Sequence, residues 1–215
     1  ILIRDLTELR DRDRQLVTKD ATIREIHHRV KNNLQTVAAL LRLQSRRMSN
    51  SDAKDALKQA MGRVSAIAVV HEILSQNFEE QVAFDEVADR ILHMVGDVAA
   101  SSGSVVARRE GSFGEVPAET ATALSLATTE LCQNAIEHSL DSSSGNVIVR
   151  PHRTDDALVV DIVSDGKPLP EGFSLDNHRS SLGLSIVTTL MQDLGGTFTL
   201  EDNSDRVGTL SLIHI

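Results

Sequence analysis

The sequence predicts an α+β protein in which a long helical hairpin precedes a mixed domain of helices and an antiparallel or mixed sheet. Residues 6–48 contain no Gly and no Pro and carry apolar residues at helical spacing. After about residue 78 the pattern changes, and segments of alternating β-branched residues bounded by turn-forming residues follow. A chain of 215 residues is long enough for two such units, each with its own core.

The first predicted helix spans residues 6–48. Its apolar residues recur at steps of three, four and seven, which is the spacing of one helix face. Residues 10–20 are so highly charged that this part of the helix needs a partner, which a coiled coil would provide. The apolar residues are Leu6, Leu9, Leu16, Ile23, Ile26, Val30, Leu34, Val37 and Leu41.

The second predicted helix spans Ala53–Gln76 and follows a break at MSNSD, where Ser51 or Asp52 is the candidate N-cap. Two antiparallel helices with apolar stripes cannot bury both stripes within one hairpin. We therefore expect a homodimer in which two hairpins form a four-helix bundle.

The mixed domain is predicted from a series of shorter elements. Pro117 opens a long helix at a favourable first-turn position, and DSSSG supplies turn residues after that helix. A loop rich in Gly, Pro, Ser and Asn follows the second of two paired strands. The predicted helices are 85–99, 117–139 and Leu182–Leu194; the predicted strands are 105–109, 146–152, 157–164, 197–201 and 207–213; the loop is 165–181.

Composition and charge exclude some functions. The net charge is −9 and the pI is about 5.3, with no Trp or Tyr, so we expect no nucleic-acid partner. The single cysteine, Cys132, cannot form an internal disulfide, and we interpret it as a core thiol in a reducing compartment. No run of 18 or more apolar residues occurs, so we expect a cytoplasmic protein with no membrane partner.

The stretch EIHHRVKNNLQT places several polar groups on one face of the first helix. His28 and Asn32 are four residues apart and share this face, with Glu25 about one turn earlier. A neutral imidazole, with a pKa of about 6.5, is a good nitrogen nucleophile, and a nearby carboxylate can orient the ring. Arg29 and Lys31 are suited to meet an incoming phosphate.

A second polar stripe occurs in TELCQNAIEHS, where Glu130, Asn134 and His138 follow one another at four-residue intervals. An amide or carboxylate oxygen is a ligand type that Mg²⁺ accepts alongside phosphates and waters. The sequence contains neither a P-loop nor the Gly-rich loop of protein kinases. In SSLGLSIV, Gly183 allows close backbone approach to a phosphate just before the helix from Leu184, whose amides favour an anion.

The histidine stretch, from Glu25 through Gln44, closely resembles the phosphoacceptor helix of histidine kinases, in the PdtaS-type soluble subfamily where His-Arg-x-x-Asn replaces the usual His-Glu. The resemblance implies that His28, which directly precedes Arg, accepts the phosphoryl group. Glu25 and Asn32 are then candidate catalytic neighbours. His27 is a neighbour or seam residue and remains the alternative acceptor.

The second stripe resembles the N box of the GHKL (Bergerat-type) ATPases, which are α/β sandwich domains that bind ATP and Mg²⁺. The resemblance implies that Asn134 holds the metal, that Glu130 helps activate the attacking group, and that His138 lies near the phosphates. SSLGLSIV resembles the G2 box, which adds Gly183 and Leu184 to the ATP-binding residues.

VSDGKPLPEGF resembles the G1 box, but it departs from the usual Asp-x-Gly-x-Gly pattern. Aligned on Gly166, Ser164 stands where the family has the Asp that accepts a hydrogen bond from the adenine amino group. Either Asp165 takes over through a shifted turn, or adenine is bound without this charged hydrogen bond, with water in its place. Loss of such a bond costs about 1.5–3 kcal/mol, so we expect weakened nucleotide binding.

The resemblance implies a sensor histidine kinase that autophosphorylates on His28 and passes the phosphate to an aspartate of a separate response-regulator receiver domain. The alternatives are a dimeric scaffold with a decayed nucleotide pocket, or a GHKL ATPase of the chaperone or repair type. We expect three units: a signalling helix or linker at 1–22, a dimerisation and phosphotransfer unit at 23–78, and an ATP-binding domain at 79–215. Residues 2–16 resemble the exit of a PAS-type sensor domain, and the chain begins with Ile, so we expect a sensor upstream.

Overall fold

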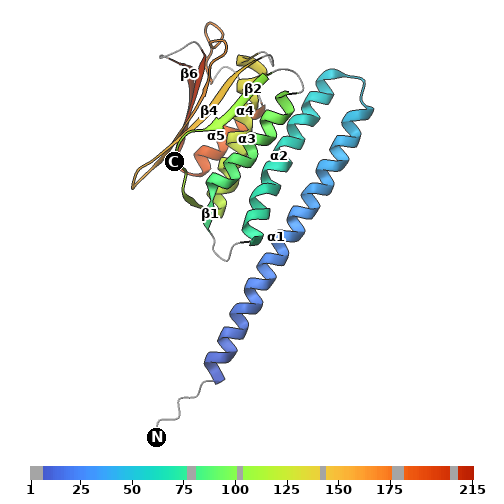
Figure 1. The fold of residues 1–215 in the computed structure, drawn as a ribbon, viewed down its shortest axis with the longest axis vertical. Helices are drawn as coiled ribbons and strands as arrows, with labels where there is room; N and C mark the ends of the chain where they lie inside the picture. Colours follow the sequence, from blue (N-terminus) through green and yellow to red (C-terminus); the bar gives the residue numbers. More distant parts are fainter. Residues whose placement is uncertain (1–6, 77–80, 101–103, 141–143, 176–181, 204–207) are drawn as a thin grey trace.

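The computed structural model describes residues 7–76, 81–100, 104–140, 144–175, 182–203 and 208–215, and for residues 7–20, 98–100 and 104 it describes the backbone only. Figure 1 shows a helical hairpin that stands beside a mixed domain, with the N-terminal helix extending well beyond that domain. The predicted α+β class, with a hairpin before a mixed domain, is confirmed.

The hairpin consists of α1 (Thr7–Arg47) and α2 (Ser51–Gln76), close to the predicted bounds. The N-cap of α2 differs from the prediction. Asn50 Oδ1 accepts a hydrogen bond from the backbone N–H of Ala53 at 3.2 Å, so the cap lies one residue before Ser51. The hydroxyl of Ser51 donates instead to Asp52 within the first turn.

The larger sheet has five strands in the order β2-β4-β5-β7-β6, and it is mixed, as expected. β2 pairs with β4 in parallel, and the other neighbours are antiparallel. Because β4 and β5 form the predicted hairpin, Val149 lies opposite Ile162 in the centre of the sheet. The strands are β2 (Ser104–Arg109), β4 (Ser144–Arg153), β5 (Leu158–Ser164), β6 (Thr197–Asp202) and β7 (Thr209–His214).

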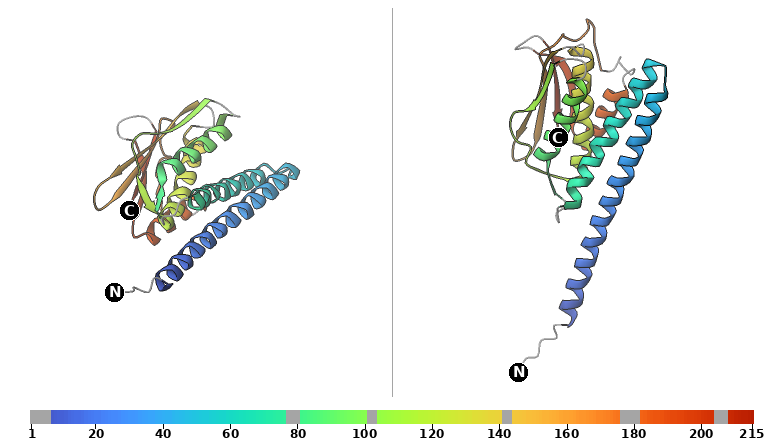
Figure 2. Two further views of the ribbon diagram at one scale, coloured as in Figure 1. Left: turned by 60° about the horizontal axis from the view of Figure 1, so that its bottom comes forward. Right: turned by 45° about the vertical axis from the view of Figure 1, so that its right-hand side comes forward.

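Three helices, α3 (Phe84–Ala100), α4 (Ala118–Asn134) and α5 (Leu182–Asp193), cover one face of this sheet. Pro117 is the N-cap residue of α4, with φ −57° and ψ 149°. It therefore lies just before the first turn, whereas the sequence predicted it within that turn. In Figures 1 and 2 the layers follow one another as sheet, helices, α2 and α1. α2 therefore separates α1 from the mixed domain.

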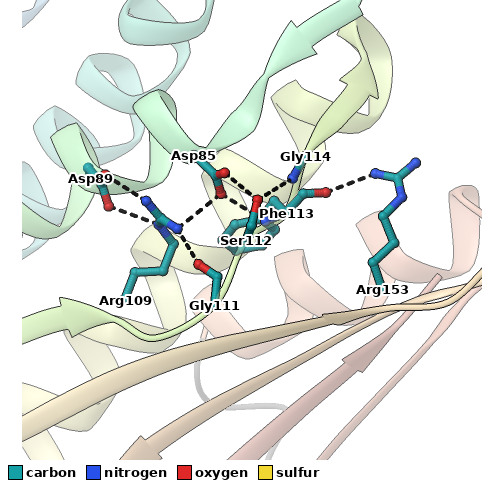
Figure 3. Close-up of polar contacts among 8 residues, drawn as sticks. All are labelled: Asp85, Asp89, Arg109, Gly111, Ser112, Phe113, Gly114 and Arg153. Carbon is teal, nitrogen blue, oxygen red and sulfur yellow. Dashed lines mark hydrogen bonds and ion pairs between the residues drawn. The ribbon is translucent and has the colours of Figure 1, made fainter.

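A small second sheet was not predicted. β1 (Gln81–Ala83) pairs antiparallel with β3 (Glu115–Pro117), and each strand is too short to show a period. The loop before β3 is held by Asp85, which accepts hydrogen bonds from the Phe113 N–H and the Ser112 hydroxyl (Figure 3). Arg109 donates hydrogen bonds from Nε and Nη2 to the two carboxylate oxygens of Asp89 and so fixes β2 to α3.

One face of α2 packs into the core of the mixed domain. Ala66, Val70 and Ile73 are almost fully buried and belong to the same hydrophobic cluster as residues of α3 and α4. Steps of four and three residues continue this face back to Arg63 and Gln59. We call these five residues, 59, 63, 66, 70 and 73, the docking face of α2.

Candidate active site

A cavity of about 790 Å³ opens between α4, α5, the loop after β5 and the C-terminal strands, and this volume is typical of small-molecule sites. The N-terminal half of α2 also contributes, since Ala56 and Gln59 line the cavity. Apolar side chains from the loop and the strands, including Phe173 and Leu200, form part of the wall. The cavity therefore has an apolar part, and a polar part that lies beside the hairpin.

The polar part contains the stripe that the sequence singled out. Glu130, Asn134 and His138 all line the cavity. The helix widens here, because a π-helical turn spans Ala135–Ser139, and the Leu140 N–H bonds to the Ala135 carbonyl five residues earlier. The Nδ2 atom of Asn134 is buried and has no hydrogen-bond partner among the described residues.

Glu130 is the most constrained member of the stripe. Its side chain is 4% exposed, and both carboxylate oxygens accept hydrogen bonds from Arg63 of α2, at 2.7 and 2.8 Å. The hydrogen bond to Glu130 raises the pKa of Arg63, against the opposing effect of burial. Sequence reasoning missed Arg63, because its partner Glu130 lies 67 positions away in the chain and no local pattern on α2 indicates the contact.

The first turn of α5 forms another wall of the cavity. Leu182, Gly183 and Leu184 line it, so the N-terminal amides of a twelve-residue helix are at hand for an anion. The sequence predicted this arrangement for Gly183 and Leu184. Residues 176–181 of the predicted loop lie outside the described residues.

The two G1-like residues Asp165 and Gly166 do not line the cavity. The carboxylate of Asp165 accepts hydrogen bonds from the backbone N–H and the side-chain amide of Asn146, both at 2.6 Å. A Cβ on Gly166 would lie 2.2 Å from the carbonyl oxygen of Ser139. Gly166 therefore lets the loop approach the end of the π-helical turn, while Asp165 closes the loop onto β4.

Ser164, which replaces the expected Asp, is 1% exposed and lies behind the cavity wall. Its hydroxyl is 2.8 Å from the hydroxyls of both Ser139 and Thr209. Ser139 and Thr209 themselves line the cavity. Sequence reasoning missed both residues, because they are 25 and 45 positions from Ser164 in the chain.

The residues present fit Mg-ATP. The volume, the apolar wall and the amides of α5 suit a nucleotide, and the buried Asn134 amide lacks a partner that a ligand or metal shell could supply. Among the described residues no cluster of three or more His, Cys, Asp or Glu is placed to hold a metal ion. Asn134 would then bind Mg²⁺ together with phosphate oxygens and waters.

The histidine stretch lies on α1, away from the cavity. His28 and Asn32 are exposed, and the Glu25 carboxylate pairs with Arg29 at 2.7 Å. The ring of His27 instead meets that of His71 on α2, with an Nδ1–Nδ1 distance of 3.0 Å. His27 is therefore a residue of the seam between the two helices.

The fold and the site together define a class: a helical hairpin that presents an exposed histidine, followed by a sandwich domain with a nucleotide-sized cavity. Comparison with known families agrees. The family described as histidine kinase matches residues 25–99, and the family described as histidine kinase-like ATPase domain matches residues 97–209. The chain belongs to the sensor histidine kinase family, and the resemblance seen in the sequence is confirmed.

Individual relatives are similar over most of this chain. Sensor histidine kinase PdtaS of Mycobacterium tuberculosis (strain ATCC 25618 / H37Rv) is 52% identical over 209 residues, which are 96% of this chain and 42% of that protein. PdtaS of Mycolicibacterium smegmatis is 50% identical over 205 residues, 94% of this chain and 41% of that protein. The chain therefore spans less than half the length of these relatives.

A solved structure is similar over nearly the whole chain. The histidine kinase domain of the Erythrobacter litoralis EL346 blue-light activated histidine kinase superposes with a TM-score of 0.64 at 26% identity, covering 95% of this chain and 94% of that one. In the parts of the chain that the structure describes, no helix combines the length and apolarity needed to cross a bilayer.

The His27–His71 contact predicts a pH dependence of stability. Burial, and then the neighbouring His27 ring, lower the pKa of His71 below its ordinary value of 6.5. Because the folded state resists protonation, this pair contributes stability above pH 6.5 that is lost as the pH falls below that value. The free energy of unfolding from urea titrations should fall between about pH 7.5 and about pH 5.5.

The variant His71→Leu should reduce this fall, because it removes the group that resists protonation. His214→Gln is the matched control, since His214 is exposed and its side chain has no partner among the described residues. An equal pH dependence in the parent and in His71→Leu would show that the seam pair is not its source.

Proposed function

We propose that the chain is the kinase part of a cytoplasmic sensor histidine kinase, which phosphorylates itself on His28 from ATP. The observation that supports this most is the combination of an exposed histidine on the hairpin with a nucleotide-sized cavity that contains Glu130, Asn134 and His138. An imidazole nitrogen of His28 would attack the γ-phosphorus, ADP would leave, and the ring would release its N–H proton. The phosphoryl group would then pass to an aspartate of a response-regulator receiver domain.

Each polar residue has a proposed role. Bound Mg²⁺ would neutralise charge that develops on the transferred phosphoryl group. Asn134 would hold this ion, while the amides of Gly183 and Leu184 would receive phosphate oxygens and His138 would lie beside them. Glu130 would help to activate the attacking ring once its carboxylate is released from Arg63.

The residues beside His28 have a positioning role in this proposal. Asn32 shares its exposed face and can orient the ring or an incoming phosphate. Glu25, about one turn before His28, forms an exposed ion pair with Arg29, which directly follows His28 and so lies near the path of a phosphate. We propose units at 1–22, 23–78 and 79–215 for linker, phosphotransfer and nucleotide binding.

The phosphoacceptor assignment can be tested with radiolabelled ATP. His28→Gln should abolish incorporation of label, because no nucleophile remains at that position. His27→Gln is the matched control and should retain most of it, since His27 faces His71. Label that persists in His28→Gln and disappears in His27→Gln would assign the acceptor to His27.

The same assay distinguishes the alternative function, a dimeric scaffold with a decayed pocket. Replacement of the family Asp by Ser164 is the observation that favours this alternative. It predicts no label in the parent chain and no calorimetric heat with Mg-ATP at millimolar concentration, whereas a kinase should give both.

Phosphorylation requires the ATP-binding domain to leave its position on α2. His27 contacts His71, so His28 lies at the level of residue 71 along the hairpin, whereas Gln59 lines the cavity. These twelve residues of helix correspond to about 18 Å along its axis, and transfer needs reacting atoms about 3–3.5 Å apart. A partner hairpin related by a two-fold axis along the bundle would present its own His28 at the same level.

A reversible crosslink tests this movement. Gln59 Nε2 lies 3.3 Å from Glu137 Oε2, so cysteines at these two positions can be joined by a short bis-maleimide with a cleavable disulfide. Burial raises the pKa of the native Cys132 thiol to about 12, which keeps it unreactive. Autophosphorylation should fall at least about tenfold in the crosslinked protein and recover after reduction.

The single variant Gln59→Cys, treated with the same reagent, is the control for modification alone. Full activity in the crosslinked double variant would contradict the requirement for domain movement.

We also propose that the hairpin dimerises through α1. Large apolar side chains remain exposed on this helix, including Leu40 at 57% and Ile26 at 53%. An apolar stripe of this kind calls for a partner surface. The exposed residues on α1 are Ile23, Ile26, Val37, Leu40 and Leu43, and the exposed Met48 directly follows the helix.

Leu40→Glu should convert a dimer into a monomer, because it places a charge in this stripe. Light scattering coupled to size-exclusion chromatography measures the mass. Gln44→Glu, an exposed polar position on the same helix, is the control and should stay dimeric. A dimer of unchanged mass in Leu40→Glu would remove the stripe from the interface.

A further inference from the structure

We infer that Ser139, Ser164 and Thr209 form a one-directional hydroxyl relay that selects a purine with an amino group at position 6, adenine, over one with a carbonyl there. This inference rests on the proposed function, because it takes a nucleotide to be the ligand of the cavity. It concerns the part of the cavity wall that Ser139 and Thr209 line, with the buried Ser164 in contact with both.

The direction of the relay follows from counting protons. Each hydroxyl has one proton to donate and two lone pairs that accept. The Ser139 hydroxyl lies 3.1 Å from the backbone carbonyl of Lys167, and a carbonyl can only accept. Ser139 therefore donates to Lys167, and its 2.8 Å contact with Ser164 must be a hydrogen bond that it accepts.

The same reasoning extends to the next link. Ser164 donates its only hydroxyl proton to Ser139. In the 2.8 Å contact between Ser164 and Thr209, Thr209 is therefore the donor. Ser164 also accepts from the backbone N–H of Thr209 at 3.3 Å, which fills both of its lone pairs. Protons thus point from Thr209 through Ser164 and Ser139 to the carbonyl of Lys167.

This order determines what the cavity wall offers. Thr209 has donated its proton inward, so its two lone pairs have no other partner among the described residues and can only accept. Ser139 likewise keeps one lone pair. An amino group would be received, whereas a carbonyl oxygen would meet acceptors and lose its hydrogen bond to water, which costs binding energy.

Two neighbouring groups do not make this selection. The Asp165 carboxylate is held by Asn146 and does not line the cavity. Ser211 does line it, but its side chain has no hydrogen-bond partner among the described residues, so its hydroxyl can rotate to donate or accept. The relay therefore provides neutral acceptors in place of the family's carboxylate. The backbone carbonyl of Lys167 fixes the direction of its hydrogen bonds.

The supports of the relay are built into the backbone. The Lys167 N–H donates to the Ser139 carbonyl at 2.8 Å, so these two residues are joined in both directions. Gly166 lacks the Cβ that would collide with the Ser139 carbonyl. The carbonyl that terminates the relay is thus held in place by the same close approach.

Binding affinity, measured without turnover, tests the inference. Isothermal titration calorimetry of the 215-residue chain would compare Mg-ADP with the Mg complex of inosine diphosphate, whose base carries a carbonyl at position 6. We expect at least about tenfold tighter binding of ADP. Equal affinities would overturn the inference alone, whereas no binding of either nucleotide would also overturn the proposed function.

Ser139→Ala tests the direction of the relay. Without Ser139, the Ser164 proton turns to Thr209, and the Thr209 hydroxyl is released to donate into the cavity. The preference for ADP should fall to about threefold or less, as expected once one hydrogen bond no longer discriminates. A preserved tenfold preference in Ser139→Ala would overturn the relay.

Two further variants keep the test decisive if Ser139→Ala does not fold. Thr209→Val keeps the shape of the side chain and removes the accepting oxygen, so ADP affinity and the preference should both fall. Ser211→Ala is the matched control, in which the preference should stay unchanged. Loss of the preference in Ser211→Ala, or its retention in Thr209→Val, would assign selection to another group and overturn the relay. Thermal unfolding of each variant verifies the fold.

Discussion

The packing of α2 against the mixed domain is the contact on which the rest of the structure depends. Its buried residues join two units into one hydrophobic cluster, and its polar residues reach the cavity. Gly62 faces the side chain of Gln133 at this contact, and a Cβ there would lie 2.5 Å from the movable amide nitrogen. Arg63 and Glu130 form a nearly buried ion pair at this contact, and such a pair is costly to break on one side only. The docking face of α2 therefore fixes the position of the mixed domain, and through Arg63 it also binds the Glu130 carboxylate.

The cavity combines two kinds of recognition that depend on different physics. Beside α2, amide and carboxylate groups and the amides of α5 suit charged phosphates and a hard cation. Where Ser139 and Thr209 line the wall, neutral hydroxyls suit a base, and their discrimination comes from proton direction rather than charge. These neutral groups avoid the desolvation cost that an unpaired buried carboxylate would bring.

Much of this arrangement could be predicted from the sequence, because long periodic segments such as 6–48 and paired β-branched strands carry strong patterns. The stripe of Glu130, Asn134 and His138 was predictable for the same reason. Other features depend on contacts between distant segments. Apolar residues surround much of α2, so periodicity alone could not tell the docking face from the face toward α1. Likewise, no local pattern indicates that Ser164 meets Thr209, and the displaced Asp165 is understood only from its contact with Asn146.

The π-helical turn at Ala135–Ser139 has a consequence for how this site tolerates change in chain length. A π turn holds one residue more than an α turn, and it ends at Ser139, whose carbonyl and hydroxyl both engage Lys167. Removal of a single residue would restore an ordinary helix with every backbone bond satisfied, yet it would swing Ser139 around the axis and away from its partner loop. A deletion in this segment would thus disrupt the site by rotating Ser139 about the helix axis, although the helix itself would become more regular.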